Sequence, residues 1–235
     1  MQSALVEPGC LYVIATPIGN RADWSARAPA TLAEVDWIAC EDTRSFHRLT
    51  SGLDQTFPSL VLYRDDNEKS IAEKLTERLE AGESGAIITD AGTPGVSDPG
   101  FRIVRACHQK GIPVRAVPGP SALTAFLSIA GIPTDAFLFL GFLPPKSARR
   151  RTTFKEYENF PHTIIFYESV HRIEKFMDDL LTVLPPDRIV SYGRELTKQH
   201  ETLFTGTLEK AREHILQRAR KGEFVIGLAP AAYTL

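Results

Sequence analysis

Short apolar runs without regular polar alternation are the feature that most constrains how this chain folds. In the first half, each run has the length of a β-strand and is rich in β-branched or aromatic residues. The runs are Leu11–Ala15, Trp37–Cys40, Leu60–Tyr63, Ala86–Thr89 and Val114–Val117. Strands that are apolar on both sides are typical of a parallel sheet that is covered by helices on both faces.

Helical patterns lie between these runs. Ile71, Leu75 and Leu79 recur at helical spacing, and the segment 101–110 has the pattern of another helix. Because strands and helices alternate, the sequence predicts a doubly wound α/β domain over residues 1–117.

The segment 117–121, with the sequence VPGPS, is the best candidate for a domain boundary, because two prolines and a glycine interrupt regular structure there. We therefore expect an N-terminal α/β domain over residues 1–117 and a C-terminal α/β domain over residues 118–235. Ser121 is expected to cap a helix that runs to about Ile129.

The C-terminal half combines strand and helix patterns in a different order. Its expected strands are Phe137–Phe142, Thr163–Tyr167, Arg188–Tyr192, Thr202–Thr205 and Phe224–Leu228. Its expected apolar helix faces are formed by Ile173, Phe176, Leu180, Leu181 and Leu184, and by Leu208, Ala211, Ile215 and Ala219. The close succession of Arg188–Tyr192 and Thr202–Thr205 predicts an antiparallel pair of strands, and therefore a mixed sheet.

Composition argues against several classes of protein. The chain is 43% apolar and 24% charged, which is ordinary for a globular protein, and it has no apolar stretch long enough to span a membrane. The N-terminal residues lack the basic and apolar regions of a signal peptide, so we expect a cytoplasmic location. Cys10, Cys40 and Cys107 are widely spaced, which favours buried thiols, and no ligand spacing predicts a metal.

Charge is distributed unevenly along the chain. The formal net charge is −2, whereas a protein that binds nucleic acid over its whole surface is usually more basic. The second half is net positive, and its densest basic run contains Lys146, Arg149, Arg150 and Arg151. Contact with phosphates is therefore expected to be local, although a solvated first turn of a helix explains the same run equally well.

Two loops follow the ends of expected strands, where open α/β sheets bind ligands. The first contains Thr16, Pro17 and Asn20 in the sequence TPIGN, and the second runs from Asp90 to Gly100 and is rich in glycine, proline and aspartate. Exposed backbone in such loops can bind an adenine edge or a ribose. Neither loop matches a dinucleotide-binding or P-loop motif, and an ordinary connection is the alternative for both.

Polar residues also follow two further strands. Glu41, Asp42 and Arg44 come after the strand that ends at Cys40, and the DDNE segment that contains Asn67 follows the next strand. Helix capping by Asp42 or Thr43 explains the first segment as well as a substrate role does, and capping of the next helix by Asn67 is the simpler explanation of the second. Polar loops that meet at one edge of a sheet nevertheless predict a cleft.

Segments along the whole chain together resemble the tetrapyrrole methylase superfamily. In chain order they are TPIGN, EDTR, TDAGTPGVSDPG, PGPSA, GFLPPK, FYESVHR, RELTK and KGEF. Each motif alone is weak, but their order from Leu11 to Leu228 is specific. Within the superfamily, these motifs are most similar to those of enzymes that methylate the ribose 2′-hydroxyl of a cytidine in small-subunit (16S) ribosomal RNA.

The resemblance implies two α/β/α domains of the class III methyltransferase type, with S-adenosylmethionine bound in a cleft between them. It also implies a homodimer that acts on small-subunit ribosomal RNA or on the 30S subunit. The cofactor contacts implied by matching motif positions are Thr16, Pro17, Gly92, Thr93, Val96, Ser121, Ala122, Phe166, Tyr167, Gly227 and Leu228. The substrate contacts expected from the polar loops and the basic run are Asn20, Glu41, Asp42, Arg44, Lys146, Arg149, Arg150 and Arg151.

A ribose hydroxyl is a poor nucleophile near neutral pH, so a base or a positive neighbour is expected beside it. The candidates at the motif edges are Asp98, Glu168, His171, Glu195, Lys198 and His200. Of these, we expect Glu168, Glu195 and Lys198 to face the substrate, without assigning the base. A surface ion pair or a helix cap is the alternative for each.

The chain departs from the family pattern in two places. The family usually has histidines near the DDNE segment, where this chain has Arg64 and Asp66, so a histidine base is not expected there. Family members also often carry a further C-terminal segment, whereas this chain ends at Leu235, so we expect either a naturally short chain or a trimmed one.

Two other functions stay open. Methylation of a tetrapyrrole ring would use the same fold and cofactor, although the KSARRR, EDTR and FYESVHR segments favour RNA. A non-catalytic nucleotide-binding module belongs to a different class and would be distinguished by binding ATP instead of S-adenosylmethionine.

Overall fold

The computed structural model describes residues 6–217 and 222–235, and it divides the chain into one unit that ends at Ser121 and another that begins at Ala122. The segment expected to separate two domains connects the last strand of the first unit, which ends at Val117, to a helix that starts at Ala122. Ala219 and the lysine of the KGEF motif, Lys221, lie outside the described residues.

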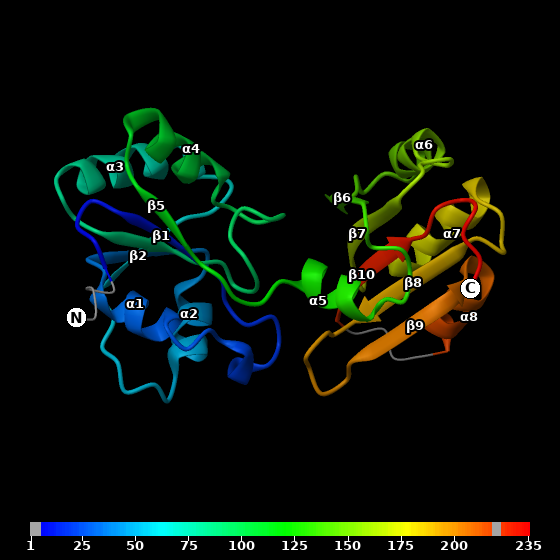
Figure 1. Ribbon diagram of the computed structural model, residues 1–235, viewed down its shortest axis with the longest axis horizontal. Helices are drawn as coiled ribbons and strands as arrows, with labels where there is room; N and C mark the ends of the chain where they lie inside the picture. The colour runs from blue at the N-terminus through cyan, green and yellow to red at the C-terminus, as the bar shows by residue number, and fades with distance from the viewer. Residues whose placement is uncertain (1–5, 218–221) are drawn as a thin grey trace. The chain divides into compact units, whose positions relative to one another are not determined.

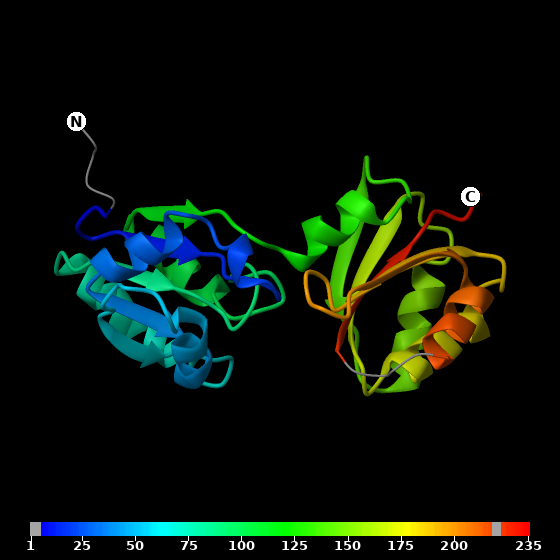
Figure 2. The ribbon, with the colours of Figure 1, turned by 90° about the horizontal axis from the view of Figure 1, so that it is seen from below.

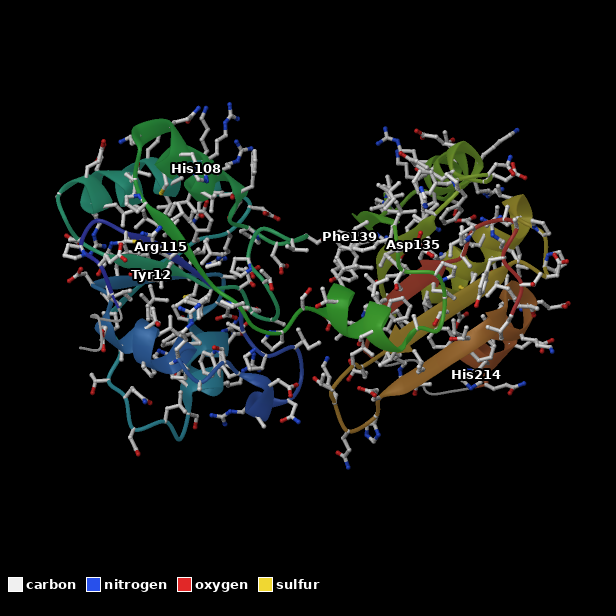
Figure 3. All side chains as sticks on the ribbon, in the orientation of Figure 1. Tyr12, His108, Arg115, Asp135, Phe139 and His214 are labelled. Carbon is white, nitrogen blue, oxygen red and sulfur yellow. The ribbon has the colours of Figure 1, made fainter. Side chains whose placement is uncertain are left out.

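The first unit is built on a parallel sheet of five strands in the order β3-β2-β4-β1-β5. Its strands are β1 (Leu11–Ile14), β2 (Trp37–Cys40), β3 (Ser59–Leu62), β4 (Gly85–Ile87) and β5 (Val114–Val117). The predicted parallel sheet is therefore confirmed. Figure 3 shows Tyr12 of β1 and Arg115 of β5, which are direct partners in the register.

Helices cover both faces of this sheet, as Figure 1 shows. They are α1 (Ala28–Glu34), α2 (Thr43–Thr50), α3 (Glu68–Glu80), α4 (Phe101–Lys110) and the short 3₁₀ helix η1 (Arg21–Asp23). Side chains alternate along each strand, so Tyr12 packs with α1 and α2 while Leu11 packs with α3 and α4. This two-sided burial explains why the strands lack polar alternation.

The second unit contains a mixed sheet of five strands in the order β6-β7-β10-β8-β9. Its strands are β6 (Phe137–Phe142), β7 (Thr163–Ser169), β8 (Ile189–Arg194), β9 (Thr202–Thr207) and β10 (Glu223–Leu228). Only β6 and β7 run parallel among these pairs, and the predicted antiparallel pairing of β8 with β9 is confirmed.

The helices of the second unit are divided unequally between the two faces of its sheet (Figure 2). They are α5 (Ala122–Ile129), α6 (Ser147–Glu156), α7 (Ile173–Val183) and α8 (Leu208–Leu216). The last three bury an apolar core with the sheet that includes Phe154, Phe176 and Ile215. On the other face, Phe126 of α5 packs over Gly193 and Gly227, where an added Cβ would lie 3.1 and 3.0 Å from its ring and closer still to Leu196 and Ile132.

Arg150 on α6 is buried in this unit, with 1% of its surface exposed. Its Nε and Nη2 atoms donate to Oδ2 of Asp179 over 3.0 and 2.6 Å, and its Nη1 atom donates to the carbonyl of Pro145 over 2.9 Å. This corrects the expectation that Arg150 contacts a phosphate, because its guanidinium is enclosed and already paired. Arg151, on the next position, also pairs with Asp179 but is half-exposed.

We predict that Arg150→Ala lowers the free energy of unfolding by about 3 kcal/mol, because it leaves a buried carboxylate with only the partial compensation of Arg151. The matched control is Arg149→Ala, which truncates an exposed neighbour on the same helix and should change stability by less than about 0.5 kcal/mol. Urea denaturation followed by circular dichroism measures both. Equal losses for the two variants would contradict the buried ion pair.

Candidate functional site

The loops that follow β1 and β4 are joined by backbone hydrogen bonds at the carboxyl edge of the first sheet. The N–H of Thr16 donates to the carbonyl of Gly92 over 2.8 Å, and the N–H of Gly92 donates back to the carbonyl of Thr16 over 3.1 Å. The buried hydroxyl of Thr16 donates to the carbonyl of Thr89 over 3.0 Å. Two loops that are far apart in the sequence therefore form one backbone surface.

The connection after β5 belongs to the same edge. The N–H of Ala15 donates to the carbonyl of Val117 over 3.2 Å, and the hydroxyl of Thr93 donates to the carbonyl of Pro120 over 3.2 Å. Gly119 lies so close to Ala15 that an added Cβ would be 3.1 Å from the Ala15 Cβ. Gly119 belongs to the predicted domain boundary and to the PGPSA motif, and a glycine between two prolines is the sequence signal for such a close backbone approach.

The loop from Asp90 to Gly100 has an irregular backbone. Gly92, Gly95 and Gly100 have φ values of 87°, 80° and 143°, and Ser97 has φ 63°. Such angles favour glycine, so the glycine-rich sequence is required by the loop's path. Pro17 and Gly92 are buried, whereas Thr93 and Val96 are partly exposed.

A cavity of about 630 Å³ lies beside this loop, at the ends of β2 and β3. It is lined by Glu41, Asp42, Thr43, Arg44, Leu62, Arg64, Asp65, Asp66, Asp90 and Pro99. Three of the four polar loops at this sheet edge therefore line one cavity within the first unit, whereas no residue of the 16–20 loop lines it. Within residues 6–217 and 222–235, no group of His, Cys, Asp or Glu side chains is arranged to hold a metal.

Carboxylates in this cavity differ in how readily they take up a proton. Burial raises the pKa of Glu41, and the charges of Asp90 and Asp65 raise it as well. The N–H of Asp90 donates to the Glu41 carboxylate over 3.1 Å and lowers the pKa, but the net shift is upward. Hydrogen bonds from Arg44 lower the pKa of Asp42 to about 2. Glu41 therefore holds a proton more readily than an ordinary glutamate, whereas Asp42 stays ionised.

Some of the residues expected to contact the substrate also stabilise local structure by capping helices. Asp42 caps α2 by accepting a hydrogen bond from the N–H of Arg44 over 2.8 Å, which confirms the capping prediction. Asn20 caps η1 in the same way through Ala22. Asn67 stands before α3, but its side chain bonds to Arg64 and not to a helix amide, so the expected cap is wrong.

Glu168, in the second unit, is wholly buried. Its carboxylate accepts hydrogen bonds from the N–H of Ser169 over 2.7 Å and from Nη2 of Arg172 over 2.8 Å. Arg172 also donates to the carbonyl of Leu143 over 2.8 Å. The expectation that Glu168 faces a substrate is therefore corrected: its side chain connects the end of β7 to the turn after β6.

Glu195 and Lys198 form a partly exposed ion pair of 2.8 Å on the loop between β8 and β9. Burial raises the pKa of Glu195, but hydrogen bonds from Lys198 and from the N–H of Glu223 outweigh it, so this pKa is lowered. Burial lowers the pKa of Lys198, but its hydrogen bonds and charge interactions with Glu195 and Glu223 raise the pKa by more, so the net shift is upward. Both groups are therefore charged near neutral pH.

The remaining cofactor candidates of the second unit lie on the paired strands β7 and β10. Phe166 and Leu228 are about 1% exposed and belong to the apolar core, so their side chains are not accessible to a ligand. Tyr167 is partly exposed and packs against Phe139, which Figure 3 labels. Gly227 lies under Phe126 of α5.

Comparison with known proteins identifies the family. A model of the family described as tetrapyrrole (corrin/porphyrin) methylases matches residues 10–212. The chain belongs to the tetrapyrrole methylase family. The described residues of this tetrapyrrole methylase contain no helix long and apolar enough to cross a membrane.

Similar curated proteins carry one name. A protein of Xylella fastidiosa (strain Temecula1 / ATCC 700964) named ribosomal RNA small subunit methyltransferase I is 46% identical, covering 96% of this chain and 83% of that protein. The protein of the same name from Escherichia coli O157:H7 is 43% identical, covering 96% and 79%.

Solved structures share the fold of this chain at low sequence identity. The methyltransferase CobJ matches with a TM-score of 0.71 and 18% identity, covering 97% of this chain and 96% of that one. Diphthine synthase matches with a TM-score of 0.68 and 13% identity, covering 94% and 90%. The predicted arrangement of two α/β units, one parallel and one mixed, is therefore the tetrapyrrole methylase fold.

The raised pKa of Glu41 predicts a dependence of stability on pH. Between the ordinary pKa of glutamate and the raised value, the folded chain binds more protons than the unfolded chain, so the Glu41 contribution to stability falls as pH rises through this window. We expect Glu41→Gln to be more stable than the wild type at pH 7 and about equally stable at pH 4. Denaturation at both pH values measures this, and an equal difference at both would contradict it.

Proposed function

We propose that this chain transfers a methyl group from S-adenosylmethionine to the ribose 2′-hydroxyl of a cytidine in small-subunit ribosomal RNA. The observation that carries the proposal is 46% identity over 96% of the chain to a ribosomal RNA small subunit methyltransferase I, together with family membership. The choice of a cytidine as the target nucleotide, and of its 2′-oxygen as the methyl acceptor, rests on the motif resemblance.

The backbone surface around β1, β4 and β5 suits this cofactor chemically. The loops 16–20, 90–100 and 117–121 contain no lysine or arginine, the side chains that most often neutralise a bound polyphosphate. They offer backbone groups and small side chains. The buried hydroxyl of Thr89, directly before the second loop, has no hydrogen-bond partner among the described residues. An adenosine without phosphates fits such a surface better than ATP does.

The residues proposed to hold the cofactor in the first unit share this edge. They are Thr16, Pro17, Gly92, Thr93, Val96 and Ser121. Phe166, Tyr167, Gly227, Leu228 and Ala122 of the second unit remain predicted contacts. When bound, the cofactor supplies an activated methyl group on a positive sulfur, so the protein's contribution is mainly to bind and orient the acceptor hydroxyl.

Among the expected catalytic residues, Glu195 and Lys198 remain the proposed contacts for the substrate in the second unit. Lys198 is protonated near neutral pH, so it is suited to binding a phosphate or a developing negative charge and not to removing a proton. Glu41 and Asp42, with Arg44 and Asn20, are the proposed substrate contacts of the first unit.

The basic side of α6 is the proposed contact for the RNA backbone. Lys146 and Arg149 are exposed, and Arg151 is 47% exposed in its side chain, so all three can reach a phosphate. An RNA backbone offers a phosphate at every nucleotide, and such cations bind phosphates. The curated relatives also favour RNA over the tetrapyrrole and non-catalytic alternatives. A homodimer that works in the cytoplasm on the 30S subunit completes the proposal.

Calorimetry tests the cofactor assignment. We expect the protein to bind S-adenosylmethionine and S-adenosylhomocysteine but not ATP, because the loops lack cations for phosphates. Gly92→Ala should weaken binding by about tenfold or more, since its φ of 87° strains any other residue. The control is Gly82→Ala, at φ 95° in a turn with open space around it. Binding of ATP alone would contradict the proposal.

Salt titration tests the basic surface. The double variant Lys146→Ala, Arg149→Ala should bind 16S RNA more weakly and reduce the slope of log affinity against log salt by about 1.5, if each cation neutralises one phosphate. The control removes Lys69 and Lys74, two exposed lysines on α3. Cofactor affinity should stay unchanged in both variants. An unchanged slope in the α6 variant would exclude this surface.

A further inference from the structure

Helix α4 begins at the far end of the glycine-rich loop and lacks a cap of its own. Its N-cap position is Gly100, which has no side chain to accept hydrogen bonds from the first-turn amides. An uncapped N-terminus leaves backbone donors without intrahelical partners, and here those donors are buried or partly buried. Another element must therefore supply the acceptor.

Glu68, the first residue of α3, supplies it. Its Oε1 atom accepts hydrogen bonds from the N–H of Gly100 over 3.0 Å and from the N–H of Arg102 over 3.1 Å. Helices α3 and α4 lie side by side on one face of the first sheet (Figure 1). A carboxylate at this position also interacts favourably with the α4 macrodipole. Glu68 therefore caps a helix other than its own.

Tyr63 holds this carboxylate in place. Its hydroxyl donates to Oε1 of Glu68 over 3.0 Å and accepts a hydrogen bond from the N–H of Ile103 over 3.2 Å. Tyr63 is 1% exposed and Glu68 is 8% exposed, so both partners are shielded from water. Burial and then the charge of Glu68 raise the pKa of Tyr63, so its hydroxyl remains a donor.

The cap controls where the loop ends. Gly100 has φ 143°, and an added Cβ would lie 3.0 Å from the backbone nitrogen of Gly95. The N–H of Gly95 in turn donates to the carbonyl of Pro99 over 3.1 Å. The start of the loop is fixed by Gly92 through Thr16, and its end is fixed at Gly100 through Glu68.

We propose that Glu68, oriented by Tyr63, is a positioning residue that holds the far end of the 90–100 loop in its ligand-binding path. The proposal rests on the assignment of that loop to S-adenosylmethionine. Neither residue touches the cofactor in this role. They act by removing conformational freedom that binding would otherwise have to restrict.

The test measures affinity for S-adenosylhomocysteine by calorimetry at a temperature where each variant is folded. Glu68→Ala should bind about tenfold more weakly, because the loop end loses its anchor. Glu68→Gln keeps the volume and one acceptor oxygen, and should recover affinity to within about threefold of the wild type. Tyr63→Phe removes only the hydroxyl and should bind S-adenosylhomocysteine a fewfold more weakly. If Glu68→Ala does not fold, this variant tests the positioning role in its place.

The matched control is Asp36→Ala. Asp36 also accepts hydrogen bonds from a loop, through the N–H of Ser84 over 2.6 Å and its hydroxyl over 2.8 Å, but at the start of β2 and β4. Asp36→Ala should lower the free energy of unfolding without changing the affinity for S-adenosylhomocysteine. Wild-type affinity in both Glu68→Ala and Tyr63→Phe, or an equal loss in Asp36→Ala, would overturn the positioning role. A wild-type protein that binds no S-adenosylhomocysteine would instead overturn the proposed function.

Discussion

Reciprocal backbone hydrogen bonds between Thr16 and Gly92 are the constraint on which the candidate site depends. They join the loops after two central strands of a parallel sheet, and the loop after β5 joins them through Thr93. Because the contacts are made by backbone atoms, they require glycine and proline at particular points more than they require charged side chains. The result is a surface of backbone groups and small side chains, in which Asp90 and Asp98 of the second loop are the charged residues.

Charged side chains in the fold divide into those that hold the structure and those available to a ligand. Arg150 and Glu168 are buried and paired, so they stabilise the second unit and cannot bind a substrate in this conformation. Arg149 is exposed on α6, the helix that carries Arg150, and Lys146 is exposed just before this helix begins. A single basic run thus contains both a buried structural residue and exposed residues, and only burial distinguishes its members.

Much of the fold could be predicted from local sequence patterns, because strands buried on both faces leave continuous apolar runs. Helix α1 has no counterpart among the predicted elements, because seven residues show too few periods to detect, and α2 is indicated only by its candidate cap, Asp42. The burial of Arg150 could not be predicted either, because its partner Asp179 is 29 positions away. Glu68 looked like part of a local helix start, and its role depends on α4, which begins more than thirty residues later.

Direct observation of methyl transfer tests the central proposal. Small ribosomal subunits from cells that lack this protein are incubated with the purified chain and S-adenosylmethionine carrying a labelled methyl group. Mass spectrometry of the digested RNA should then find label in a 2′-O-methylcytidine of 16S RNA, with no label in a parallel reaction containing a porphyrinogen. Label in the porphyrinogen but not in the RNA, or in neither substrate although the cofactor binds, would contradict the proposal.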